Sequence, residues 1–261
     1  MTGGPAPGCA VVTGSSSGIG RAIAERLAAD GFPVLLADVR RDPLTGGTPT
    51  DEVIAAAGGR CEFVRTDVSS RDDCERLVGL AAGRYGRLEV LVNNAVLAGR
   101  HSRPLLDTLD ADWDAMMAVN LRGPFILCQA AVRQMLTQEP RGEARGRIVN
   151  ITSQHGMVGV PGHFAYAVGK GGLVQMTRQI AVEHGRDGIL CNAVAPGKIL
   201  TGAPGDLAAD PDSAAYVWSR TPFGRLGQPA DVAAAVAFLA SGQASYISGV
   251  NLLVDGGWMA Y

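Results

Sequence analysis

The chain has 261 residues, of which 47% are hydrophobic and 18% are charged, and its formal net charge at pH 7 is −2. This length and apolar content allow a substantial buried core. The near-neutral balance, without a run of Lys or Arg, argues against a nucleic-acid partner or an anionic membrane partner. Residues 1–8 form a Gly/Pro-rich tail without a signal-peptide pattern, and no apolar stretch is expected to span a membrane.

Cysteine and histidine usage bears on the compartment and on metal binding. The cysteines are scattered and form no CxxC pair: Cys9, Cys61, Cys74, Cys128 and Cys191. They predict reduced, mostly buried thiols in an intracellular protein, which we expect to be cytoplasmic. The four histidines form no HExxH pattern, so no metal site of that kind is expected.

Short apolar runs alternate with amphipathic segments from one end of the chain to the other. The apolar runs are nearly continuous, as expected of parallel strands covered on both faces. They span Cys9–Thr13, Pro33–Asp38, Cys61–Thr66, Leu88–Val92, Arg147–Thr152, Ile189–Ala195 and Val250–Val254. The amphipathic segments include Ile19–Ala29, Asp72–Tyr85, Trp113–Leu136, Phe164–His184 and Pro229–Ala240. This alternation predicts an α/β fold of Rossmann type, with one doubly wound, seven-stranded parallel sheet and helices on both faces.

No break in composition divides the chain, so residues 9–261 are expected to form a single catalytic domain. Two polar segments interrupt the alternation, Arg40–Thr50 and Lys198–Pro222. The second is long for a simple connection and contains Trp218, which favours a loop or lid over a substrate.

A glycine-rich turn, Thr13–Gly20 (TGSSSGIG), directly follows the first predicted strand and leads into a helix. Glycines let the backbone approach a pyrophosphate, and the helix N-terminus supplies free N–H groups and a positive dipole end. The GxxxGxG spacing differs from the general GxGxxG fingerprint. The strand before it and the helix after it nevertheless predict a dinucleotide site. The residues expected to line it are Gly14, Ser16, Ser17, Gly18, Ile19 and Gly20.

Asp38, at the end of the second predicted strand, indicates which dinucleotide is bound. A carboxylate there can accept hydrogen bonds from the ribose hydroxyls of NAD and would repel the 2′-phosphate of NADP. Arg21, Arg40 and Arg41 lie nearby in sequence and keep NADP open, because guanidinium groups bind phosphate. We favour NAD.

Tyr166 and Lys170 are spaced for general acid/base chemistry, with Ser153 thirteen residues upstream. Residues i and i+4 share one face of a helix. A nearby ammonium lowers the pKa of a phenol, whose ordinary value is about 10. The pair therefore predicts a tyrosine able to exchange a proton with a substrate hydroxyl.

Taken with these motifs, nearly the whole chain resembles a single-domain short-chain dehydrogenase/reductase. Thr13–Gly20 resembles the TGxxxGxG cofactor loop of that family. The remaining matches follow in the family's order: Asp67-Val68, Asn93-Asn94-Ala95, Asn120, Ser153, Tyr166-x-x-x-Lys170, Pro196-Gly197 with Ile199 and Thr201, and Tyr246–Gly257.

Two features depart from the family pattern. Val96 replaces the glycine of NNAG, and a β-branched residue does not readily adopt a positive φ. The backbone beside the cofactor is therefore expected to differ slightly there. Three glycines, Gly169, Gly171 and Gly172, surround Lys170. They are expected to allow close packing against a neighbouring helix, in the same chain or in a partner subunit.

The resemblance implies hydride transfer between a secondary alcohol or its ketone and a nicotinamide. It makes Tyr166 the acid/base, Ser153 a donor to the substrate oxygen, and Lys170 a ligand of the nicotinamide ribose that lowers the tyrosine pKa. Asn120 is implied to hold a water that links Lys170 to solvent. Further cofactor contacts are implied at Asp67, Val68, Asn94, Ala95, Pro196, Gly197, Ile199 and Thr201.

Substrate recognition is expected from residues near Ser153 and from the 198–222 loop. The candidates are Leu97, Gln154, His155, Lys198 and Trp218. Positive charge from Arg100, His101, Arg103 and Lys198 suggests a polar or anionic substrate.

Three functions remain open from the sequence. They are an NAD-dependent dehydrogenase of a sugar, polyol or cyclic alcohol, an NADPH-dependent 3-oxoacyl thioester reductase, and a catalytically silent NAD-binding sensor. Family resemblance also implies a homo-oligomer, with a tetramer favoured through the helices that carry Asn120 and Tyr166. The apolar segment Trp258–Tyr261 suggests a buried C-terminal end.

Overall fold

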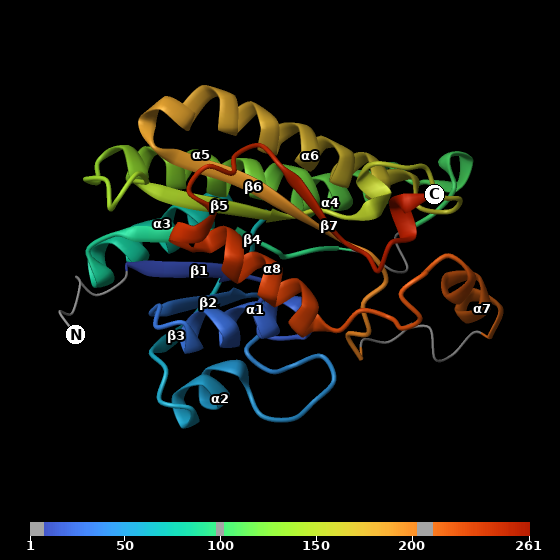
Figure 1. Ribbon diagram of the computed structural model, residues 1–261, viewed down its shortest axis with the longest axis horizontal. Helices are drawn as coiled ribbons and strands as arrows, with labels where there is room; N and C mark the ends of the chain where they lie inside the picture. The colour runs from blue at the N-terminus through green and yellow to red at the C-terminus, as the bar shows by residue number, and fades with distance from the viewer. Residues whose placement is uncertain (1–7, 98–101, 203–210) are drawn as a thin grey trace.

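The computed structural model describes residues 8–97, 102–202 and 211–261. Its centre is a seven-stranded parallel sheet in the order β3-β2-β1-β4-β5-β6-β7 (Figure 1). The strands are β1 (Cys9–Thr13), β2 (Val34–Asp38), β3 (Cys61–Arg65), β4 (Leu88–Asn93), β5 (Gly146–Ile151), β6 (Ile189–Pro196) and β7 (Asn251–Val254). This confirms the predicted doubly wound α/β fold, and every predicted strand lies within one residue of its place.

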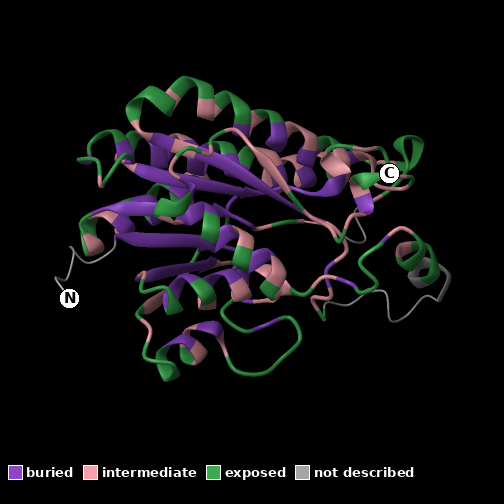
Figure 2. Ribbon diagram, in the orientation of Figure 1, coloured by how far each residue is buried: buried purple, intermediate pink, exposed green. Residues whose placement is uncertain are grey.

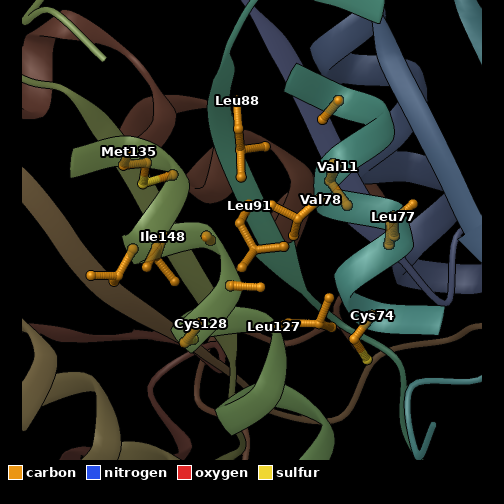
Figure 3. Packing of buried hydrophobic residues seen from close by; sticks show 14 of the residues in the cluster. Val11, Cys74, Leu77, Val78, Leu88, Leu91, Leu127, Cys128, Met135 and Ile148 are labelled. Carbon is orange, nitrogen blue, oxygen red and sulfur yellow. The ribbon is translucent and has the colours of Figure 1, made fainter. Parts of the chain in front are cut away.

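Helices cover both faces of the sheet and bury two separate apolar layers (Figures 1 and 2). One layer lies under α3 (Arg71–Tyr85) and α5 (Gly123–Leu136), where Leu77, Leu91 and Ile148 are fully buried (Figure 3). The other lies under α1 (Gly18–Ala29) and α8 (Pro229–Ala240). Because β1 to β6 contribute to both layers, their sequences are apolar on both faces rather than alternating.

The predicted helix over residues 113–136 contains one turn that the periodicity does not reveal. It consists of α4 (Asp110–Met117), a π-helical turn η3 (Ala118–Arg122), and α5. Contrary to expectation, this run, Asp110–Leu136, is long and apolar enough to cross a membrane by length and composition. Half of its most apolar window is buried inside the fold, as in a core helix of a globular domain.

Two short helices were not predicted: one directly follows the polar segment Arg40–Thr50, and the other lies within the segment Lys198–Pro222. The helix α2 (Thr50–Ala56) begins directly after Pro49, and its first turn carries Asp51 and Glu52, which suit a helix N-terminus. The helix α7 (Pro211–Ser219) occupies part of the predicted substrate loop. Both are short, so their apolar periodicity is too brief to separate from a polar connection. The remaining long helix, α6 (Phe164–His184), matches its predicted bounds.

Buried polar side chains interact with one another at both ends of strands β4 and β5. Below the catalytic helix, Asn93 Nδ2 donates to Asn150 Oδ1 at 2.8 Å, and Asn150 Nδ2 donates to Thr177 Oγ1 at 2.9 Å. At the opposite edge, the Glu89 carboxylate lies 2.9 Å from Arg87 Nε and 3.6 Å from Arg147 Nη1. Burial lowers the pKa of both arginines, so the fold depends on Glu89 to balance their charge.

All five cysteines are free. Four are buried, and burial raises the pKa of Cys9, Cys74 and Cys128 to about 12. Cys61, the first residue of β3, is half-buried, and burial also raises its pKa. These thiols fit the prediction of reduced, mostly buried side chains.

Candidate active site

The glycine loop forms a backbone cradle between β1 and α1. Gly14 and Gly18 adopt φ angles of 63° and 54°, a region that side chains rarely occupy. Gly20 is constrained by space, because a Cβ there would lie 2.0 Å from the Gly14 carbonyl oxygen and 2.4 Å from Asn94 Nδ2. A Cβ at Gly18 would meet Thr201 at 3.3 Å, so the loop also approaches the segment after β6. Because these positions lack side chains, a ligand such as a pyrophosphate can approach the backbone of the loop directly.

Thr13 and Asn94 fasten this cradle to the end of β4. Thr13 Oγ1 accepts hydrogen bonds from the backbone N–H groups of Asn94 and Ala95, at 2.9 and 3.0 Å. Asn94 Nδ2 donates to the carbonyl oxygens of Thr13 and Gly14. No described residue other than glycine has a positive φ, so Val96 replaces the family glycine without backbone strain.

The Asp38 carboxylate lies at the end of β2, against the glycine loop. Its Oδ2 accepts from Ser16 N at 3.1 Å, and its Oδ1 accepts from Arg40 N at 3.3 Å. Two of the three arginines that kept NADP open are bound elsewhere. The first of these is Arg21, which forms an ion pair with Glu25 and donates a hydrogen bond to the Thr48 carbonyl oxygen.

Arg41 is held by acidic residues of α2. Its Nη2 lies 2.7 Å from Asp51 Oδ2 and 2.8 Å from Glu52 Oε1. Of the three arginines near Asp38, this leaves Arg40 as the one whose guanidinium has no ion-pair partner among the described residues. The local charge at Asp38 is therefore less favourable to a phosphate than the sequence suggested.

The other expected cofactor residues also lie along the C-terminal edge of the sheet. Asp67 Oδ1 accepts from the backbone and hydroxyl of Ser69, and Val68 is buried beneath it. After β6, Gly197 N donates to the Val254 carbonyl, and Ile199 pairs with Gly227. The candidate cofactor residues Ser17, Ile19 and Pro196 lie at the start of α1 and the end of β6. The fold thus gathers these segments at the edge where doubly wound sheets bind ligands.

The catalytic candidates come from the segment after β5 and from α6. Ser153 caps the short helix η4 (Gln154–Gly156), and its Oγ accepts from His155 N at 3.1 Å. Lys170 is 3% exposed, and its Nζ donates to the Ile151 carbonyl at 2.7 Å and lies 5.9 Å from the centre of the Tyr166 ring. The other two N–H bonds of this ammonium have no acceptor among the described residues. A buried ammonium with free donors is suited to receive ribose hydroxyls.

The pKa of Tyr166 is raised, although a neighbouring Lys170 was expected to lower it. Burial raises the pKa of Tyr166, and interaction with the Ser153 hydroxyl only partly opposes it. Burial lowers the pKa of Lys170 to about 8. The lysine is therefore a weaker electrostatic support for the phenolate in the cofactor-free protein than the i, i+4 spacing alone predicts, because desolvation acts on both charged forms.

Asn120 lies within the π-helical turn and is fully buried. Its Oδ1 accepts from Leu97 N at 2.8 Å, and its Nδ2 donates to the Leu97 carbonyl at 2.8 Å. The side-chain amide thus holds the segment after β4, whereas the resemblance implied a role in holding water. The glycines of α6 complete this contact, because Gly169 packs against Met117 and Gly172 against Leu121 within the same chain.

An aromatic wall stands beside Tyr166, and we define it as His155, His163 and Trp258. The His155 ring lies 6.4 Å from Tyr166, 5.6 Å from His163 and 6.4 Å from Trp258, centre to centre. His163 is 6.2 Å from Tyr166. Sequence reasoning missed two of these residues. His163 could have been found from its position three residues before Tyr166, but no local pattern points to Trp258.

The other substrate candidates are placed less favourably. Trp218 is about half exposed on α7, without a ring contact to the aromatic wall among the described residues. Arg103 pairs with Asp112 at 3.3 Å rather than presenting a free charge. Arg100 and His101 lie outside the described residues. Lys198, directly after Gly197, is half-buried.

The Trp258–Tyr261 segment is partly buried, as expected. Trp258 is buried, whereas Tyr261 is exposed, and the guanidinium of Arg220 stacks on both rings at 4.9 and 5.2 Å. Tyr261 Oη donates to the Ser219 carbonyl at 3.1 Å. This segment therefore ties the aromatic wall to the end of α7.

A family profile described as Enoyl-(Acyl carrier protein) reductase matches residues 14–259. The chain belongs to the short-chain dehydrogenase/reductase family. It is 36% identical over 252 residues to glucose 1-dehydrogenase 2 of Bacillus subtilis, which covers 97% of this chain and 95% of that one. It is 37% identical over 256 residues to a 3-oxoacyl-[acyl-carrier-protein] reductase of Synechocystis, with 97% of each chain covered.

The fold also matches solved structures of this dehydrogenase/reductase family. A proposed NAD(P)-dependent gluconate 5-dehydrogenase from Beutenbergia cavernae, crystallised with NADP, superposes with a TM-score of 0.88. It is 37% identical, and 98% of each chain is covered. The chain is thus an NAD(P)-dependent alcohol dehydrogenase/reductase of this family.

The residues present fit a nicotinamide dinucleotide. The cradle at Gly14 and Gly20 excludes any side chain, and the Asp38 carboxylate lies beside it. Lys170 offers two unused donors at the other end of the site. Within the described residues, no group of three or more His, Cys, Asp or Glu side chains is arranged to hold a metal ion.

Proposed function

We propose that this protein oxidises a secondary alcohol of a sugar, polyol or cyclic compound with NAD. The observation that carries this proposal is the assembly of Ser153, Tyr166 and buried Lys170 next to the glycine cradle, with Asp38 at the ribose end. Residues 9–261 would act as one catalytic domain, with residues 198–222 as its substrate loop.

The proposed reaction balances as the loss of two hydrogens from the alcohol. Bound NAD would supply the acceptor for the hydride of the carbinol carbon, so the products would be a ketone, NADH and a proton. Ser153 donates a hydrogen bond to the substrate oxygen. Tyr166 receives the hydroxyl proton, and Lys170 orients the ribose and favours the phenolate.

Burial raises the pKa of Tyr166 in the cofactor-free protein. We therefore expect the phenolate, which acts as the base, to form only when the cofactor and the substrate are bound. Asn120 supports the reaction as a positioning residue, since its amide holds Leu97 beside the cofactor edge. The water-mediated relay from Lys170 to solvent that the family resemblance implies for Asn120 stays a prediction.

The preference for NAD rests on Asp38 and on the pairing of Arg21 and Arg41 with acidic residues or backbone. NADP remains the competing cofactor, because the related gluconate dehydrogenase structure contains NADP. The kinetic preference is measured by comparing kcat/KM for the two cofactors with one substrate.

A 3-oxoacyl thioester reductase is the second candidate, supported by the similarity to the Synechocystis enzyme. It would use NADPH, which the Asp38 carboxylate disfavours. A catalytically silent NAD sensor is disfavoured because all three catalytic side chains are present and adjacent.

We also propose that the protein is cytoplasmic and forms a homo-oligomer, with a tetramer favoured. Support for association comes from exposed apolar side chains on the helices that carry the site: Phe125, Leu136, Val168 and Val182. Light scattering at micromolar concentration tests this, and a monomer would contradict it.

The deciding experiment is a screen of secondary alcohols and ketones with NAD(H) and NADP(H), followed by Tyr166→Phe on the best substrate. We expect turnover by the wild type and a loss of at least about 100-fold in kcat for the variant, since positioned acid/base groups contribute that much. Full activity of the variant would refute the mechanism. No turnover of any compound would favour the sensor.

A further inference from the structure

We infer that the substrate carries a carboxylate, and that Lys198 binds it while Tyr166 and Ser153 hold the hydroxyl that is oxidised. This makes the substrate a hydroxy acid rather than a neutral alcohol. The inference rests on the proposed function and adds a charged subsite to it.

The composition of the chain first draws attention to Lys198. The protein has 23 basic residues of the Lys/Arg type, but only two of them, Lys170 and Lys198, are lysines. Both lie at the C-terminal edge of the sheet, after β5 and β6. A chain that uses arginine nearly everywhere else thus places its two compact, strongly hydrated ammonium groups in and beside the active site.

Lys198 lies next to the aromatic wall. Its predecessor, Gly197, packs so closely that a Cβ would lie 3.1 Å from Gln154 Oε1. Lys198 is also near enough to His155 and His163 to lower the pKa of both rings. Those rings lie 6.4 and 6.2 Å from Tyr166, so the same two imidazoles neighbour both the phenol and Lys198.

The histidines are neutral at neutral pH, which leaves Lys198 and Arg220 as the charged groups near this wall. Burial, with the neighbouring His163 and Lys198, lowers the pKa of His155 to about 4. Burial and Lys198 also lower the pKa of His163. Neutral imidazoles can donate hydrogen bonds to the hydroxyl groups of a substrate and accept hydrogen bonds from them. An ammonium binds an anion more strongly than a neutral imidazole does.

The Lys198 ammonium has no acidic partner among the described residues. Asp255, whose backbone abuts Gly197, directs its two carboxylate oxygens to the backbone N–H groups of Gly257 and Met259. Arg220, the other cation close to the wall, stacks on Trp258. A half-buried cation without a counter-charge is suited to receive one negative charge, and a carboxylate supplies one.

A polar group beside Gly197, the residue before Lys198, also lacks a partner among the described residues. Gln154 is 6% exposed, and its buried Oε1 accepts no hydrogen bond. A buried acceptor of this kind is costly to leave unsatisfied, so a donor on a bound ligand would stabilise it.

Matched pairs of compounds test the charge directly. The probes are aldonic acids and hydroxycyclohexane carboxylic acids, each with its own carboxamide, which has nearly the same shape without the charge. We expect the wild type to favour each acid by at least about tenfold in kcat/KM, in line with a hydrogen bond to a charged group. Lys198→Met should abolish this preference, mainly through KM for the acid, and should affect the amide much less.

Lys198→Arg is the matched control, because it keeps the charge and should retain a preference for the acid. Equal losses for acid and amide in Lys198→Met, together with weaker NAD binding, would assign Lys198 to the cofactor and overturn the inference. An equal rate for acid and amide in the wild type would overturn it as well. Neither result would affect the proposed dehydrogenase activity, which fails only if no secondary alcohol is oxidised.

The low lysine content allows a readout that does not depend on turnover. Reductive methylation with ¹³C-formaldehyde labels Lys198 and the N-terminal amine, whereas Lys170 is 3% exposed. We expect the Lys198 methyl resonance, assigned by its absence in Lys198→Met, to shift when the acid is added with NADH. A resonance that responds to NADH alone and not to the acid would contradict the subsite.

Discussion

The glycine at position 20 allows a sharp test of the cofactor cradle. Gly20 lies in the first turn of α1, where alanine would ordinarily stabilise the helix by up to about 1 kcal/mol. Here the added Cβ would lie 2.0 Å from the Gly14 carbonyl oxygen and 2.4 Å from Asn94 Nδ2. Real Cβ atoms do not approach a backbone oxygen that closely, so the loop and the helix must separate.

The expected cost of Gly20→Ala follows from what that separation breaks. Overpacking costs about 1–3 kcal/mol. Displacing Asn94 removes its two hydrogen bonds to the loop, each worth about 1 kcal/mol. After subtracting the helix-propensity gain, we expect the free energy of unfolding to fall by about 2–4 kcal/mol. The NAD affinity should fall by at least about tenfold, because the cradle no longer fits the pyrophosphate.

Gly79→Ala is the control, because it adds the same atom to α3, where nothing lies within 4 Å of the new Cβ. This change should raise the free energy of unfolding by about 0.5–1 kcal/mol. Urea denaturation followed by circular dichroism measures both variants, and fluorescence titration measures NAD binding. If Gly20→Ala unfolds at the wild-type midpoint and binds NAD as tightly, the close approach is not a real constraint and our reasoning is wrong.

Three further changes probe charge. Asp38→Ser should raise the NADP:NAD ratio of kcat/KM by at least about tenfold, because it removes the charge that repels a 2′-phosphate; the same ratio in Asp42→Ser, an exposed neighbour, should not move. Glu89→Gln should lower the free energy of unfolding by about 3–5 kcal/mol, since it leaves the buried Arg87 and Arg147 without a counter-charge, and a loss below about 1 kcal/mol in urea denaturation would contradict this. Burial lowers the pKa of Lys170 from 10.5 to about 8. Between pH 8 and pH 10.5 the folded state therefore binds fewer protons than the unfolded state. The stability of the cofactor-free wild type relative to Lys170→Met should therefore rise from pH 8 to pH 10, and a constant difference would argue against the lowered pKa.

Much of the fold could be read from the sequence because its signals are local. Each buried strand is a continuous apolar run such as Leu88–Val92, and α6 was bounded correctly by its own periodicity. The π-helical turn at Ala118–Arg122 could not be read, because it inserts an extra residue into a helix whose apolar pattern barely changes. The helices α2 and α7 were missed because they are too short to establish a period.

The sequence likewise predicted the site residues that belong to local motifs, but not those that only the fold brings together. The glycine loop and the Tyr166–Lys170 spacing carry their chemistry in a few consecutive residues, so motif reasoning found them. Trp258 reaches His155 from the far end of the chain, and this proximity exists only after β6 and β7 pair. The pairing of Arg41 with α2 was likewise invisible, because the acidic partners are contributed by a helix that was itself missed.

The free thiols described above make the protein convenient for spectroscopy. Four of the five are buried, so a maleimide dye added to the native protein should react first at half-buried Cys61, slowly and at alkaline pH. Cys61 begins β3, an edge strand, whereas Ser153, Tyr166 and Lys170 follow β5, which β2, β1 and β4 separate from β3. A single fluorophore could thus be attached without substitutions, far from the reacting groups, to follow unfolding and subunit association in an enzyme that keeps its native sequence.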